Sequence, residues 1–272
     1  MARNLLIVLV YSLVEKKMKS FKHTLSFVVC AFAASVSCAA TIDVQFDNPI
    51  FTGFKDRGYD DITIHATGNN HSVVNDYVYA GRFQGTASNL VGVSSSIFVD
   101  GVNDLFLYCY DIYQEIRYGQ TVKSYTINLN GESARTLDFL GAVNQVMNKK
   151  NTVYDPYAWL HPVSGDQGAA IQLGIWESKY DDDSEWSLDE GEFKAGLLDD
   201  ETKKWWTKFT KAMKRSDSLD GRYVMVLEND TFQDMIVGDP PTVPEPGSLA
   251  LLGLGLGGLA AFAQRRKTRQ AS

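Results

Sequence analysis

Cys109 is the residue of this chain with the widest range of chemistry open to it. The sequence contains three cysteines, and Cys30 and Cys38 belong to an N-terminal stretch that we expect to be removed on export. Cys109 then remains alone in an oxidising compartment, where it has no intramolecular disulfide partner. Such a cysteine packs as a small buried hydrophobe, pairs with another chain, or takes part in other chemistry.

Two segments around and after Cys109 share a pattern with a known family. Cys109 stands between Tyr108 and Tyr110 in a predicted strand, and a predicted helix carries Gln172 and Trp176 within an apolar run. This pair of segments resembles the bacterial surface thioester domains, in which an aromatic-Cys-aromatic strand faces an apolar-Gln helix. The resemblance implies that Cys109 and Gln172 form an internal thioester. Tyr108, Tyr110 and Trp176 are suited to shield that bond in a pocket.

The implied reaction needs no cofactor. A thiolate held against a glutamine side-chain amide can expel ammonia and leave a γ-glutamyl thioester. This acyl group then acylates an amine on a partner surface, once per molecule and without turnover. We therefore expect a covalent adhesin and not an enzyme. The alternative is a non-covalent structural or carbohydrate-associated protein of the biofilm matrix, with calcium as a candidate stabilising ion, in which Cys109 only packs the core.

An acidic segment follows the predicted helix of Gln172. Its oxygen-bearing side chains follow the spacing of an EF-hand calcium loop, but Trp186 stands where the sharp turn requires glycine. A looser calcium site is one interpretation, and a solvated acidic loop is the other. The candidate ligands are Asp181, Asp183, Asp189 and Glu192.

The elements that must position these residues belong to a domain that we predict at residues 41–237. Its first half is rich in Val, Ile, Tyr, Phe and Thr, separated by Gly, Asn and Asp clusters, as is typical of strands. The predicted strands are 42–46, 62–66, 73–83, 90–99, 105–118 and 122–129, with a closing strand at 221–227.

Three helices are predicted between these strands. Apolar residues recur at helical spacing from Leu137 to Met147, which predicts the first helix, and again through residues 202–214, which predicts the last one. Between them, Ser164 with Gln167 three residues later is the pattern of a capping box at a helix start. We therefore expect an α+β fold, with a mostly antiparallel sandwich or barrel-like sheet and a helical insertion.

Composition and charge exclude several classes of protein. The chain has 272 residues, 44% of them hydrophobic, so it can bury a core and is neither a disulfide scaffold nor a disordered chain. The net charge is −7, and basic residues gather at both ends, which leaves the body acidic. Because an acidic body cannot neutralise phosphates, we expect no nucleic-acid binding.

Residues 1–40 have the pattern of a secretory signal peptide. An apolar run follows Lys19 and Lys22 and ends in small residues at Ala39 and Ala40. Met18 fits as the true start of this signal. The alternative is a lipoprotein signal in which Cys38 is acylated.

The C-terminal region carries a second targeting pattern. A proline-rich linker and box at residues 238–247 precede a short apolar helix with a basic tail at residues 248–272. The residues of this pattern are Pro244, Glu245, Pro246, Arg265, Arg266 and Lys267. A permanent transmembrane helix is one interpretation. The order of the three parts resembles the PEP-CTERM sorting signal of Gram-negative bacteria.

The PEP-CTERM resemblance implies a route and a location. An exosortase, which is a membrane protease, removes the tail from an intermediate that the C-terminal helix holds transiently in the inner membrane. The protein then reaches the cell surface or the exopolysaccharide matrix. The partners that we expect there are an exopolysaccharide or an amine on another surface.

Overall fold

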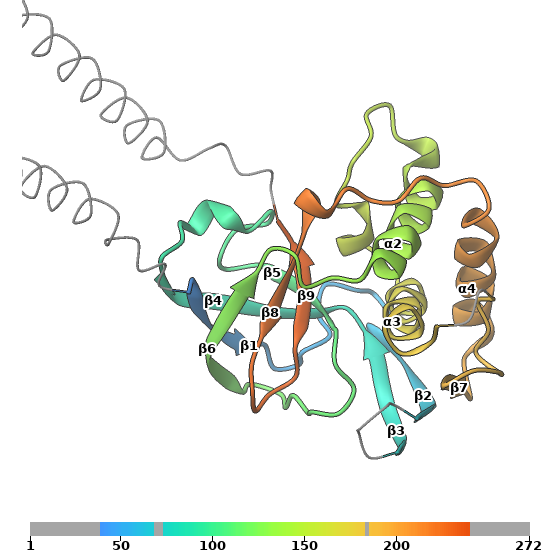
Figure 1. Cartoon of the computed structure of the whole chain (residues 1–272), viewed down its shortest axis with the longest axis horizontal. Helices are drawn as coiled ribbons and strands as arrows, with labels where there is room; N and C mark the ends of the chain where they lie inside the picture. Colours follow the sequence, from blue (N-terminus) through green and yellow to red (C-terminus); the bar gives the residue numbers. More distant parts are fainter. Residues whose placement is uncertain (1–38, 68–72, 183–184, 240–272) are drawn as a thin grey trace, which may run out of the picture. The chain divides into compact units, whose positions relative to one another are not determined.

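The computed structural model describes residues 39–67, 73–182 and 185–239 (Figure 1). Residues 1–38 of the predicted signal peptide and the sorting residues Pro244, Glu245, Pro246, Arg265, Arg266 and Lys267 lie outside these ranges. Among the described residues, no helix has the length and apolar character needed to cross a membrane.

In the described part of the chain, six antiparallel strands close into a barrel. Their order is β1 (Thr41–Phe46), β4 (Phe83–Val91), β5 (Leu105–Cys109), β9 (Met235–Gly238), β8 (Val224–Glu228) and β6 (Thr121–Asn128). Strand β1 pairs with β4 on one side and with β6 on the other, which closes the barrel. Ile42, Val44 and Phe46 of β1 are buried, because alternate residues of a barrel strand face the interior.

A second, smaller sheet has the order β3 (Val74–Gly81), β2 (Tyr59–Ala66) and β7 (Phe193–Gly196), again antiparallel. Ile62 and Ile64 of β2 are buried, and β2, β3 and β7 all contact helix α3. Tyr77 and Tyr79 of β3 are exposed. This sheet therefore has a packed face and a solvated face, as is common for antiparallel sheets.

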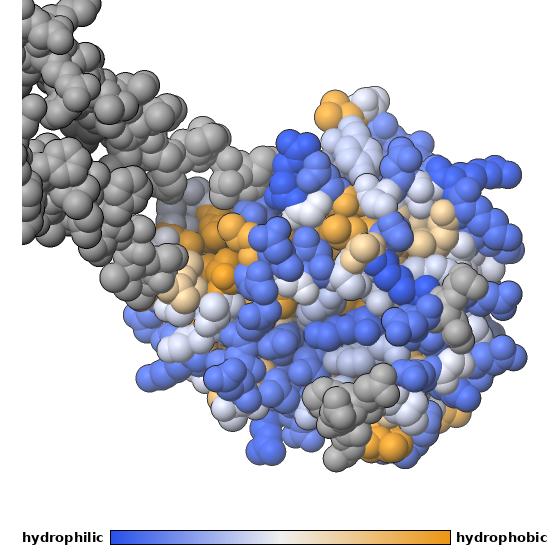
Figure 2. Space-filling model, in the orientation of Figure 1, coloured by the Kyte–Doolittle hydropathy of each residue, from blue (hydrophilic) through white to orange (hydrophobic). Residues whose placement is uncertain are grey.

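Within the described residues, three α-helices follow the predicted order: α2 (Ala134–Met147), α3 (Gly165–Tyr180) and α4 (Asp200–Ala212). Helix α3 is buried along almost its whole length and contacts α2, α4 and both sheets (Figure 1). Helix α4 buries Phe209 and exposes Lys203 and Lys204, and the side of the molecule that carries α4 is largely hydrophilic in Figure 2. Helix α3 is thus the central element of the fold.

The expected α+β class, with an antiparallel barrel-like sheet and inserted helices, is confirmed. The capping prediction for α3 is also confirmed, since the Ser164 hydroxyl accepts a hydrogen bond from the Gln167 N–H at 3.2 Å. In a full capping box the Gln167 side chain would accept the N–H of Ser164. It accepts the N–H of Val163 instead, one residue earlier, at 2.7 Å.

Several predicted strand bounds are wrong, and local turn chemistry explains two of them. The predicted strand 90–99 stops at Val91, because Gly92 has a φ of +74° and Ser94 then caps a short 3-10 helix. The predicted strand 105–118 stops at Cys109, and the Asp111 carboxylate accepts the Tyr113 N–H at 2.7 Å in a turn. The predicted strand 73–83 is divided between β3 and β4, the closing strand begins only at residue 224, and β7 and β9 were not predicted.

Gly174 permits the close packing of α3 against α2. A Cβ at this position would lie 1.9 Å from Cζ of Phe139. We expect Gly174→Ala to lower the free energy of unfolding by about 1–3 kcal/mol, because overpacking outweighs the helix propensity of alanine. Urea denaturation measures the change.

Gly168→Ala on the same helix is the matched control. Its Cβ would lie 3.4 Å from the backbone nitrogen of Arg82, which is ordinary contact, so stability should stay equal or rise. Equal losses in the two variants would contradict the packing argument.

Candidate functional site

Cys109 ends β5 with one edge of its backbone left without a neighbouring strand. On the β9 side, the N–H of Tyr110 donates to the carbonyl of Asp234 at 2.7 Å. Because successive residues of an antiparallel strand direct their backbone polar groups to opposite edges, those of Cys109 face the β4 side. Strand β4 begins at Phe83, opposite Leu107, and its pairing with β5 does not extend to Cys109.

The side chain of Gln172 occupies this open edge. The N–H of Cys109 donates to Oε1 of Gln172 at 2.8 Å, and Nε2 of Gln172 donates to the carbonyl of Cys109 at 2.7 Å. Gln172 is 0% exposed and Cys109 is 2% exposed. The carboxamide therefore completes β5 as a neighbouring peptide group would. The two residues that the sequence paired across 63 positions lie in contact.

A second amide holds the thiol. Sγ of Cys109 donates to Oε1 of Gln233 at 2.9 Å, and Nε2 of Gln233 donates to the carbonyl of Asp111. Sequence reasoning missed Gln233. It lies just before β9, a strand that was itself not predicted, and a single polar residue there gives no periodic signal.

Burial controls the protonation of the thiol. Removal from water raises the pKa of Cys109 well above its usual range, and the nearby Asp111 carboxylate raises it further. Cys109 therefore keeps its proton at neutral pH, and it differs in this from the exposed, low-pKa cysteines of redox enzymes.

A cavity of about 550 Å³ leads to the cysteine. Its walls are mostly apolar, and the buried residues Cys109, Trp176 and Gln233 line it together with exposed Asp76 and Glu115. Trp176 is 3% exposed, and its Nε1 has no hydrogen-bond partner among the described residues. The cavity therefore has a buried end at the cysteine and a charged outer end. Trp176 is in the lining, as the sequence suggested.

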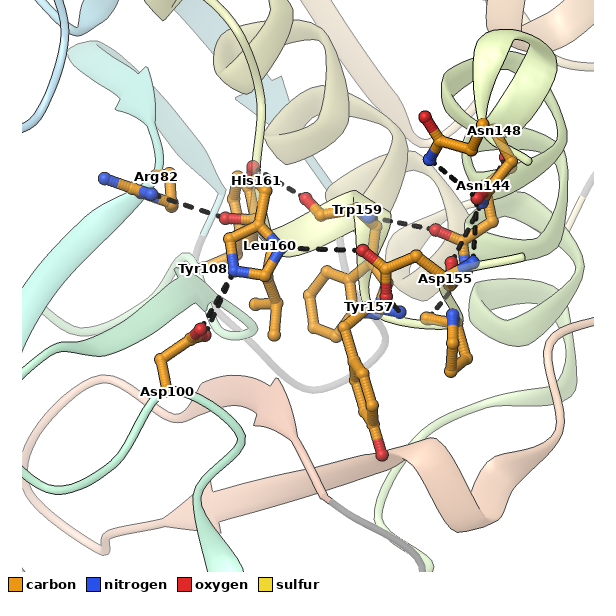
Figure 3. Close-up of polar contacts among 12 residues, drawn as sticks. Arg82, Asp100, Tyr108, Asn144, Asn148, Asp155, Tyr157, Trp159, Leu160 and His161 are labelled. Atoms are coloured by element: carbon orange, nitrogen blue, oxygen red, sulfur yellow. Dashed lines mark hydrogen bonds and ion pairs between the residues drawn. The ribbon is translucent and has the colours of Figure 1, made fainter. Parts of the chain in front are cut away.

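Tyr108 and Tyr110 do not line this cavity. The hydroxyl of Tyr108 donates to the carbonyl of Trp159 at 3.2 Å, among the polar contacts that Figure 3 shows. The hydroxyl of Tyr110 accepts the Ser133 N–H at 2.9 Å, beside α2. Neighbours in a strand point to opposite faces, so residues 108 and 110 must face away from the thiol. The expectation of a shared pocket is corrected for these two tyrosines.

The connection between α2 and α3 fixes the start of the helix that carries Gln172. The side chain of Asn144 donates to the carbonyl of Pro156 at 2.7 Å and accepts the Trp159 N–H at 2.9 Å (Figure 3). At the other end of α3, the Tyr180 hydroxyl donates to Asp111 at 3.1 Å and accepts the Ile112 N–H at 3.2 Å. Helix α3 is therefore held on both sides of Gln172.

The acidic segment after α3 does not bring its carboxylates together in the described residues. Asp181 is buried and lies so close to Gly191 that a Cβ there would be 1.6 Å from its Oδ2, while Asp189 and Glu192 are exposed. Between residues 39 and 239, leaving aside the undescribed ones, no three His, Cys, Asp or Glu side chains form a metal-binding group. Asp183 lies outside the described residues, and the calcium site stays a prediction.

Comparison with known families identifies the C-terminal region. Residues 242–267 match the PEP-CTERM protein-sorting motif, which confirms that resemblance. The motif marks an exported, cell-surface protein that an exosortase processes. Neither a curated protein nor a solved structure matches the chain, so the likeness to thioester domains stays a prediction.

Tyr180 offers a test of how the segment after Cys109 is held. Tyr180→Phe removes the hydroxyl that bonds Asp111 and Ile112, and it leaves a half-buried N–H without its partner. We expect the free energy of unfolding to fall by about 1–3 kcal/mol. The exposed Tyr154 provides the control, because Tyr154→Phe should change stability by less than about 0.5 kcal/mol. Equal effects on urea denaturation would contradict the assignment.

Proposed function

We propose that this exported surface protein is a covalent adhesin, in which a thioester between Cys109 and Gln172 acylates an amine on a partner surface. One observation carries the proposal. The Gln172 carboxamide is hydrogen-bonded to Cys109 with both residues shielded from water, beside a cavity that the cysteine lines. The carboxamide is thus held against the backbone of the residue whose sulfur would attack it, and such fixed placement of two reacting groups lowers the barrier to their reaction.

Thioester formation balances without a cofactor. Sγ of Cys109 bonds to Cδ of Gln172, the Cδ–Nε2 bond breaks, and the departing nitrogen takes the thiol proton and leaves as ammonia. The N–H of Cys109 already donates to Oε1 at 2.8 Å, where negative charge develops as the sulfur attacks. A fixed donor at that oxygen stabilises the tetrahedral intermediate, as in an oxyanion hole.

The surroundings favour a long-lived thioester that still reacts with amines. Burial keeps bulk water away from the acyl carbon, which slows hydrolysis. The cavity is lined by Cys109, whose sulfur would carry the acyl group, so it gives an amine a route to the sulfur side of the thioester. In acyl transfer the amine nitrogen bonds to Cδ, the Cδ–Sγ bond breaks, and sulfur takes the proton that the nitrogen loses. The product is an amide between Gln172 and its partner, with a free Cys109 thiol.

The sorting motif supports the setting of this reaction. After exosortase processing, we infer that the protein stays on the surface or in the exopolysaccharide matrix of a Gram-negative bacterium. Amines on neighbouring cells, proteins or amino sugars are the candidate targets there. A single acylation per molecule fits a structural cross-link and requires no turnover.

The second candidate is a non-covalent matrix protein, and a specific contact favours it. Both polar groups of the Gln172 amide are hydrogen-bonded to the Cys109 backbone, so the glutamine has a structural role even without reaction. In that case Cys109 packs the core and its thiol stays bonded to Gln233. The two candidates differ in whether the domain reacts with amines.

The test is incubation of the purified mature domain with a fluorescent primary amine. We expect one covalent adduct, located at Gln172 by peptide mapping, together with one newly titratable thiol at Cys109. Cys109→Ser and Gln172→Ala should give no adduct, because each removes one half of the thioester. Gln145→Ala, a change at an exposed glutamine of α2, should label like the wild type.

Two results would reject the covalent adhesin. One is a wild-type domain that is folded and unlabelled. The other is a Cys109→Ser domain that labels at the wild-type rate, since that reaction would not pass through the cysteine.

A further inference from the structure

The side-chain amide of Gln233 is held so that its oxygen, Oε1, and not its nitrogen, faces the cysteine. Its Nε2 donates to the carbonyl of Asp111, and its own backbone carbonyl accepts the Tyr125 hydroxyl at 2.8 Å. Gln233 is 7% exposed, and Tyr125 is fully buried. Rotation of the amide would set Oε1 against the Asp111 carbonyl, so the acceptor stays directed at Sγ of Cys109.

Thioester formation changes the partner of this oxygen. In the unreacted protein, Oε1 of Gln233 accepts the Cys109 thiol at 2.9 Å. Once sulfur is acylated it carries no proton, and Oε1 loses its donor. A buried acceptor without a donor is unfavourable, and rotating the Gln233 side-chain amide would not help, because Oε1 would then face the Asp111 carbonyl.

A primary amine supplies the missing donor. Gln233 lines the same cavity as Cys109, so an amine that enters this cavity and approaches the cysteine sulfur meets the Gln233 side chain. We propose that Oε1 of Gln233 accepts an N–H of the incoming amine and positions its nitrogen against Cδ of Gln172, a role that rests on the thioester proposed above. Gln233 is then a positioning residue with a preference for nucleophiles that carry N–H groups.

The proton balance is complete in this scheme. The amine donates one N–H to Oε1 while its lone pair attacks Cδ. The Cδ–N bond forms, the Cδ–Sγ bond breaks, and the proton lost by nitrogen passes to Sγ. The restored thiol donates to Gln233 again, as it does in the unreacted protein. The acceptor is therefore paired before the thioester forms, during amine attack and after transfer.

The experiment measures the rate of methylamine addition to the mature domain by intact mass. Gln233→Met removes the acceptor at nearly constant length, and Gln233→Asn withdraws it by one methylene. Both should still show the loss of one ammonia but react about tenfold more slowly, the effect of one hydrogen bond. Gln233→Glu in its protonated form keeps an acceptor oxygen at the same reach and can donate its O–H to the Asp111 carbonyl, so it should restore the wild-type rate when both are compared at a pH where that carboxyl is protonated. A melting curve establishes folding, and Gln233→Asn decides the outcome if Gln233→Met does not fold.

Gln114→Met is the matched control. Gln114 lines the same cavity, its Nε2 donates to the carbonyl of Asp230 at 3.2 Å, and its Oε1 is a buried acceptor with no hydrogen-bond partner among the described residues. This variant should react like the wild type. A general loss of cavity polarity would slow it as much as Gln233→Met and would overturn the proposal.

The remaining outcomes separate this proposal from the thioester itself. A wild-type domain whose mass shows no loss of ammonia would reject both the thioester and the role of Gln233. If the wild type forms the thioester and the Gln233 variants react with methylamine at the wild-type rate, only the role of Gln233 is rejected. Gln233→Met and Gln233→Asn domains that fold without forming the thioester would also overturn it, because Gln233 would then act before the amine arrives.

Discussion

The pairing of the Gln172 carboxamide with the backbone of Cys109 is the interaction on which the arrangement of the domain depends. Strand β5 extends beyond the point where β4 pairs with it, and the backbone N–H and carbonyl of its buried last residue, Cys109, need other hydrogen-bond partners. For the Gln172 side chain to reach these two backbone groups, its helix must pack against the barrel. That explains why α3 is buried almost throughout, and why Gly174 leaves space for Phe139 where α2 crosses it.

The same contact satisfies two demands that usually conflict. A reactive acyl group needs dry surroundings, and an amine needs access to it. The cavity beside Cys109 reconciles them, because its inner end, with Trp176 and Gln233, is buried while the charged residues Asp76, Glu115 and Arg117 stand at its exposed end. Because burial raises its pKa, Cys109 enters the reaction as a thiol and not as the thiolate expected from the sequence, and its proton must pass to the departing nitrogen as sulfur attacks.

The sequence predicted the parts of the fold that periodicity and capping determine. The three helices, the cap at Ser164 and the antiparallel α+β class follow from such local signals. The strand at 90–99 was wrong because the positive φ of Gly92 is set by the turn and leaves no periodic trace. Tyr108 and Tyr110 both point to the face opposite the Cys109 thiol, which the two-residue period of a strand could have predicted from the sequence. Gln233 could not be predicted, because only the folded barrel brings β9 beside β5.

Whether Cys109 and Gln172 are joined is the central question, and an electron-density map of the mature domain, crystallised without amines, answers it most directly. The adhesin account predicts continuous density between Sγ of Cys109 and Cδ of Gln172, at covalent distance and with no density for Nε2. An intact carboxamide, still donating to the Cys109 carbonyl and accepting its N–H, would contradict that account and leave Gln172 as a structural cap on β5.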